Sequence, residues 1–105
     1  MLEIAKNLGI ELKQGVYIQF LGPFYETKAE IKMVKAIGGD IVGMSTVLEV
    51  EAARQCKIDV VGLSVITNKA TGLSSQKLSH QDVLEHGKIA SKNLVTLIKE
   101  FIKNL

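Results

Sequence analysis

The sequence has few aromatic residues, and its charges form no cluster of one sign. Aromatics make up 5% of the 105 residues, and tryptophan is absent. The 13 basic and 11 acidic residues are spread along the chain, and the aromatics do not alternate with Lys or Arg. Proteins that bind nucleic acid usually carry a basic patch, often with interleaved aromatics, so we expect no nucleic-acid partner.

The sequence also lacks cysteine pairs and long apolar runs. The single cysteine, Cys56, excludes an internal disulfide and fits a reducing compartment. We expect its side chain to be a small buried apolar group rather than a nucleophile. No apolar run reaches the ~18 residues of a membrane span, and the N-terminus MLEIAKNLG does not resemble a signal peptide. These features predict a soluble cytoplasmic protein with no membrane partner.

The residues that are present predict alternating strands and helices. Hydrophobic residues make up 47% of the chain, which is enough for a core. Their spacing, together with glycines at the element ends, predicts helices at 2–8, 27–37, 46–56 and 79–105 and strands at 15–22, 40–44 and 59–67. The order of these elements predicts an α/β fold with a mainly parallel sheet and flanking helices. In such sheets ligands bind where the carboxyl ends of the strands meet the following loops.

The loop after the first expected strand reads GPFYE, and its glutamate, Glu26, has two interpretations. Thr27 and Glu30 fit a capping box, which leaves Glu26 outside the helix. Glu26 can serve as an acid near the positive end of the helix dipole or as a ligand contact, and these residues alone do not decide between the two. Tyr25 and its neighbour Phe24 would add an apolar surface that suits a flat heterocycle with an N–H donor.

The loops after the other two strands also leave interpretations open. Thr46 and Glu49 repeat the capping-box pattern, with Ser45 just ahead of it. The glycine before them and the start of the helix could admit an anion, although a structural role is more common for such a pattern. Asn68, after the third strand, could bind a ligand through its amide or could form an Asx-turn.

The two histidines do not predict a metal site. His80 lies in the first turn of the last helix, and His86 falls about 240° round that helix from it at 100° per residue. The sequence has no cysteine cluster and no carboxylate–histidine spacing that would complete a ligand set. We therefore expect no metal.

Four motifs in the same order resemble one family. GPFYETKAEI, GGDIVGMSTVLEVEAARQC, VVGLSVITNKATGLS and LSHQDVLEHGK resemble the C-terminal part of the trimeric purine nucleoside phosphorylases, which act on inosine, guanosine and, in one bacterial branch, xanthosine. The resemblance implies that residues 1–105 form the C-terminal segment of a single phosphorylase domain of the nucleoside phosphorylase/hydrolase-like fold, with the N-terminal part absent.

The resemblance also implies roles for individual residues. Glu26 would accept the purine N1–H, Asn68 would hydrogen-bond purine N7 and O6, and His80 would reach the ribose 5′-hydroxyl. Ser45 would contact phosphate. The remaining substrate contacts implied are Tyr25 on the base, Val42, Gly43 and Met44 along base and ribose, and Thr67 and Phe20.

The activity implied is phosphorolysis of 6-oxopurine (deoxy)nucleosides to a free purine and (deoxy)ribose 1-phosphate. Inorganic phosphate would be the co-substrate, with no cofactor. The family's glycine-serine phosphate loop has no counterpart here, so we expect the chain alone to be inactive and to form a homo-oligomer or pair with an N-terminal part. The alternative is a non-catalytic α/β module that keeps the fold for purine binding or assembly. The preferred purine, hypoxanthine, guanine or xanthine, stays open.

Overall fold

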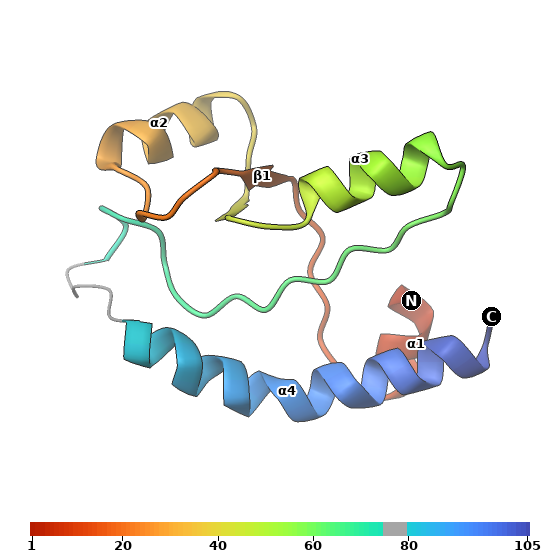
Figure 1. Cartoon of the computed structure of the whole chain (residues 1–105). Helices are drawn as coiled ribbons and strands as arrows, with labels where there is room; N and C mark the ends of the chain where they lie inside the picture. Colours follow the sequence, from red (N-terminus) through yellow and green to blue (C-terminus); the bar gives the residue numbers. More distant parts are fainter. Residues whose placement is uncertain (75–79) are drawn as a thin grey trace. The chain divides into compact units, whose positions relative to one another are not determined.

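The computed structural model describes residues 1–74 and 80–105, with the backbone alone for residues 80–83, 85, 86 and 89. Its elements follow the order α1 (Leu2–Asn7), β1 (Tyr17–Gln19), α2 (Lys28–Ala36), β2 (Ile41–Gly43), α3 (Val47–Gln55) and α4 (His80–Lys103) (Figure 1). The chain divides into two compact units. The helical unit comprises Met1–Gln14, Val65–Asn68 and Ser79–Leu105, and the sheet unit comprises Gly15–Ser64 and Lys69–Leu78. Within the described residues, no helix is both long and apolar enough to cross a membrane.

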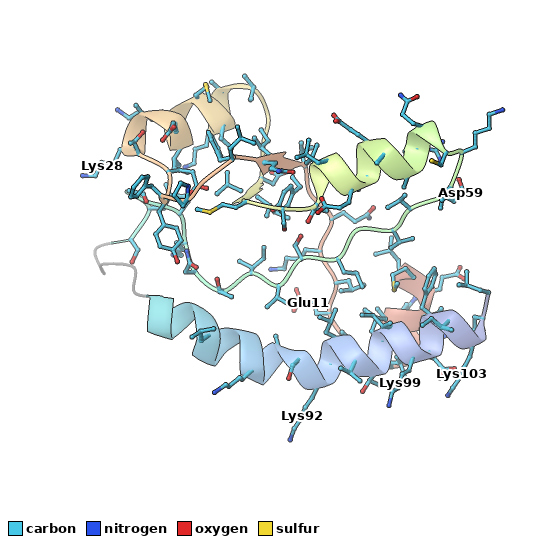
Figure 2. The ribbon with its side chains drawn as sticks, viewed as in Figure 1. Glu11, Lys28, Asp59, Lys92, Lys99 and Lys103 are labelled. Carbon is cyan, nitrogen blue, oxygen red and sulfur yellow. The ribbon has the colours of Figure 1, made fainter. Side chains whose placement is uncertain are left out.

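In the helical unit, α1 packs against α4 (Figure 1). Ala5 of α1 and Leu97 of α4 are each 1% exposed and are the buried apolar side chains among the described residues of this unit. Gly9 ends α1 with a φ of +69°, a conformation that glycine adopts without strain, as the sequence predicts. Lysines separated by seven and four residues fall on one side of α4 and project from it (Figure 2): Lys92, Lys99 and Lys103.

In the sheet unit, β1 and β2 pair in parallel, with Tyr17 opposite Ile41 and Gln19 opposite Gly43. The pairing continues one residue beyond β1, because the N–H of Phe20 donates to the carbonyl oxygen of Gly43 at 2.8 Å. Helix α2 connects the two strands and α3 follows β2 (Figure 1). Parallel strands need such a helical crossover, so this order confirms the predicted α/β class.

Helix α2 begins at the capping box that the sequence predicts. The Thr27 hydroxyl oxygen accepts from the N–H of Glu30 at 3.2 Å, and the Glu30 carboxylate accepts from the N–H of Thr27 at 2.6 Å. This reciprocal pair is the predicted capping box. Ile31 and Val34 form the buried face of the helix, each 4% exposed.

Two expectations for α3 are wrong. Thr46 makes no side-chain cap hydrogen bond, because its backbone has a φ of 87° instead of the extended conformation that turns a cap side chain toward the first-turn N–H groups. Cys56, expected to be buried, is exposed. It directly follows α3, a helix with no buried residue of its own.

The third predicted strand, 59–67, is also wrong. The segment is assigned no strand and pairs with neither β1 nor β2. Its apolar side chains are not covered on both faces, since Val61 is 51% exposed and Ile66 is 63% exposed. An apolar run becomes a strand only where a neighbouring strand supplies backbone partners, and the pattern itself cannot guarantee one.

Candidate functional site

Two loops meet at the carboxyl ends of β1 and β2. The first loop (Gly22–Glu26) follows β1, and the Ser45 turn (Ser45–Val47) follows β2 and Met44. A Cβ at Gly22 would lie 2.7 Å from Sδ of Met44, so the backbone of the first loop touches the side chain at the end of β2. Val42 lies opposite Ile18 in the sheet, and Phe20 bonds to Gly43. Two of the three loops that the strand-end rule indicates therefore follow paired parallel strands, whereas the third, after residues 59–67, follows no strand.

Glu26 is buried in the first loop. It is 8% exposed and is the only buried polar or charged side chain among the described residues. Among the described residues, none forms a hydrogen bond or ion pair with its carboxylate. That part of the chain also has no side-chain oxygen that is both completely buried and without a hydrogen-bond partner, and this includes the Glu26 oxygens. The carboxylate therefore keeps an opening to solvent. A buried polar group without a partner is unfavourable, so this position suits a donor supplied by a ligand.

The neighbouring glutamate, Glu30, is already committed to the helix. The backbone N–H of Thr27, and secondarily the Thr27 hydroxyl, lower the pKa of the Glu30 carboxyl because both donate hydrogen bonds to its charged form. Glu30 and Thr27 thus complete the cap without Glu26. Beside Glu26, Tyr25 is 46% exposed and Phe24 is 84% exposed, so both rings present open apolar surface.

The Ser45 turn is held by two side chains of β1 that the sequence analysis missed. The Gln19 amide oxygen accepts from the N–H groups of Val47 at 2.8 Å and Leu48 at 3.3 Å. The Tyr17 hydroxyl oxygen accepts from the N–H of Ser45 at 3.4 Å. Tyr17 and Gln19 are two residues apart on one strand and therefore share a face. That alternation was the signal available in the sequence.

The residues after the third expected strand divide between the units. Lys69–Leu78 belongs to the sheet unit, where a Cβ at Gly72 would lie 3.0 Å from Cγ of Lys28 at the start of α2. Thr67 and Asn68 belong to the helical unit, and the Thr67 hydroxyl donates to the Asn68 side-chain oxygen at 2.6 Å.

His80 also belongs to the helical unit, where it begins α4. The structure describes only the backbone of His80, so the role expected for its side chain stays a prediction. The preceding Ser79 lies outside the described residues. The remaining candidates lie in the sheet unit: Phe20, Tyr25, Glu26, Val42, Gly43, Met44 and Ser45. The described side chains include no group of three or more His, Cys, Asp or Glu placed to hold a metal ion.

Comparison with known proteins identifies the family. The sequence pattern of the "Phosphorylase superfamily" matches residues 1–103. The chain belongs to the phosphorylase superfamily. Among named members, it is 46% identical over 101 residues to a purine nucleoside phosphorylase of a Cellulomonas species, covering 96% of this chain and 36% of that protein. It is 42% identical over 106 residues to a probable 6-oxopurine nucleoside phosphorylase of Moorella thermoacetica, covering 100% of this chain and 41% of that protein.

Solved structures of the superfamily agree with the fold. A crystal structure of Schistosoma mansoni purine nucleoside phosphorylase in complex with inosine matches with a TM-score of 0.91 and 36% identity, covering 98% of this chain and 38% of that one. The resemblance drawn from the four motifs is thereby confirmed. The chain spans 36% to 41% of the length of these three phosphorylases.

Proposed function

We propose that the chain is the base- and ribose-recognising part of a purine nucleoside phosphorylase. With the rest of the enzyme it would catalyse phosphorolysis of 6-oxopurine (deoxy)nucleosides to a free purine and (deoxy)ribose 1-phosphate. The observation that carries the proposal is Glu26, a carboxylate 8% exposed, without a partner among the described residues and flanked by exposed aromatic rings. A purine with a proton on N1 supplies both the donor and the flat ring that this position lacks.

In the proposed reaction, a phosphate oxygen bonds to C1′ of the nucleoside while the C1′–N9 bond breaks. The bonding electron pair leaves with the purine, and the ribose gains positive character in the transition state. Asn68 would hydrogen-bond N7 and O6, where negative charge develops, and so bind the transition state more tightly than the substrate. Glu26 would hold the base by N1–H, His80 would contact the 5′-hydroxyl, and the hydroxyl of Ser45 would contact phosphate.

The remaining substrate contacts would form the walls of the site. Tyr25 would lie on the base, where its exposed ring can stack. The backbone link between Phe20 and Gly43 at 2.8 Å supports a shared wall from the two strand ends. That wall would comprise Phe20, Val42, Gly43 and Met44, with Thr67 beside Asn68. No cofactor or metal takes part in this scheme, and phosphate is the co-substrate.

The ligands of related proteins support this class of substrate. Solved Schistosoma phosphorylases contain inosine, hypoxanthine and guanosine, and one contains adenosine. Adenine carries no proton on N1, so a Glu26 carboxylate would favour 6-oxopurines over adenine in this chain. The cytoplasm, where free phosphate and purines occur together, is the proposed location.

The proposed partner is the remainder of a phosphorylase chain, alone or within a homo-oligomer. A two-stranded sheet is marginal by itself, and both outer edges of β1 and β2 lack a neighbour among the described residues. Large apolar side chains are exposed around it, including Leu21 at 86% and Ile37 at 65%. Additional strands would cover such surface and could give residues 59–67 the backbone partners of the predicted third strand. Residues 1–105 would then be the C-terminal segment of one phosphorylase domain.

The test is phosphorolysis with and without an N-terminal part. The chain is assayed with inosine and phosphate for hypoxanthine release, alone and joined to the portion of the Cellulomonas enzyme that precedes the matched region. We expect turnover only in the joined protein, lost in Glu26→Ala and kept in Glu51→Ala, a matched change on exposed α3. A folded joined protein that binds hypoxanthine without turnover would instead favour the non-catalytic purine-binding module.

A further inference from the structure

The Ser45 turn has an unfavourable backbone conformation. Thr46 has a φ of 87° and a ψ of −50°, and the N–H of Val47 donates to the carbonyl oxygen of Ser45 at 3.1 Å. A hydrogen bond across three residues with a positive φ at the centre is a γ-turn of the rare, strained kind. A β-branched residue is especially unsuited to it. Such a turn persists only where its surroundings hold it.

The surroundings are supplied by β1. The Gln19 amide oxygen accepts from Val47 and Leu48, the first two residues of α3, at 2.8 and 3.3 Å. It thus takes the place of the missing Thr46 side-chain cap: it is the acceptor for the N–H of Leu48, and it shares the N–H of Val47 with the Ser45 carbonyl oxygen. Tyr17 holds the other end of the turn through Ser45. The turn is therefore fixed on both sides from a neighbouring strand.

We propose that Gln19 is a positioning residue for the phosphate side of the active site. By holding Val47 and Leu48 it fixes the backbone that presents the Ser45 hydroxyl. Gln19 occupies the N–H groups of Val47 and Leu48, so these two donors do not bind phosphate. Phosphate recognition is then left to Ser45 and its surroundings. This role rests on the proposed phosphorolysis, whereas the capping contact itself does not.

The contact is tested in the chain by amide hydrogen exchange with NMR detection. Gln19→Met keeps the side-chain length but removes the acceptor, and Gln19→Glu keeps an acceptor oxygen. We expect exchange at Val47 and Leu48 to rise about fivefold in Gln19→Met, as for the loss of an ordinary helix cap, and to stay near the wild-type rate in Gln19→Glu. Gln55→Met, the same change at the other end of α3, is the control and should leave these amides unchanged. Equal exchange rates in wild type and Gln19→Met would overturn the proposal.

The functional role is tested by steady-state kinetics of the chain joined to the Cellulomonas N-terminal part. Gln19→Met should raise KM for phosphate about fivefold or more, while KM for inosine stays within about twofold, because only the phosphate side is misplaced. Equal rises in both constants would reduce Gln19 to a structural residue and overturn the proposal. If the wild-type joined protein has no turnover, the proposed function and the phosphate role both fail, and the exchange rates still decide whether Gln19 holds the turn.

Discussion

Replacing Gly39 by alanine should disrupt the packing that fixes α2 against β1. The added methyl would lie 2.5 Å from Cδ1 of Ile18 and 2.7 Å from Cγ1 of Val34, well inside the ~3.5 Å of ordinary carbon contacts. The Ile18 end can rotate away, but Val34 is 4% exposed and its branched side chain has one favoured rotamer in a helix. The helix must therefore shift, together with the loop that carries Glu26.

Overpacking of this kind destabilises by about 1–3 kcal/mol. With a slope of about 1–1.5 kcal/mol per molar urea for a small domain, the unfolding midpoint measured by far-ultraviolet circular dichroism should fall by about 1–2 M. Gly62→Ala is the control, since nothing lies within 4 Å of its added methyl, and it should change stability by less than about 0.5 kcal/mol. In a Val34→Ala background, Gly39→Ala should be milder by about 1 kcal/mol. Equal unfolding midpoints for Gly39→Ala and Gly62→Ala would refute the close packing of Gly39 against Ile18 and Val34.

Three further outcomes are expected. In urea unfolding, Thr27→Ala should destabilise the chain by about 1 kcal/mol because the α2 cap is lost. Thr46→Gly should stabilise it by a similar amount because glycine accepts the positive φ. A stabilised Thr27→Ala together with a destabilised Thr46→Gly would contradict both assignments. The pKa of Glu30 is lowered from 4.5 on folding, so its stabilising effect is present above 4.5 and is lost as the pH falls through the folded pKa. Stability should therefore fall less steeply with acid in Glu30→Gln, which cannot ionise, and pH profiles of wild type and Glu30→Gln that run parallel would argue against it. Light scattering of the chain alone should show association through the exposed apolar surface, and a stable monomer would argue against that interface.

Local patterns in the sequence predicted the helices well. Thr27 and Glu30 are three residues apart, and the contacts that cap α2 lie within that turn. The same pattern at Thr46 and Glu49 failed because the acceptor at this helix start is Gln19, which lies 28 residues before Val47 in the chain. A cap from a distant strand leaves no mark at the helix start itself. Tyr17 and Gln19 lie on one face of β1, and this could have suggested the cap from Gln19 only once the pairing of β1 with β2 was known.

The failed strand at 59–67 has a related cause. Its apolar run is suited to a strand covered on both faces, but the described residues supply no neighbour for it. Relatives in the superfamily are more than twice as long as this chain, and under the proposed function further strands of a phosphorylase would supply that neighbour. Burial of Glu26 was likewise beyond local reasoning, since the capping box showed only that Glu26 was not needed for the helix. The strand-end rule predicted only that its loop follows β1, at the end of the sheet where the loop after β2 also begins.

Isothermal titration of the chain joined to the Cellulomonas N-terminal part tests the central role of Glu26 most directly. The protein is titrated with hypoxanthine and with adenine, as wild type, Glu26→Ala and the surface control Glu51→Ala. Wild type and Glu51→Ala should bind hypoxanthine, and adenine should bind about 10-fold or more weakly, since it leaves the carboxylate unpaired. Glu26→Ala should lose both the hypoxanthine affinity and the preference. Undiminished binding of hypoxanthine by a folded Glu26→Ala protein would contradict the assignment of Glu26 as the residue that recognises the purine.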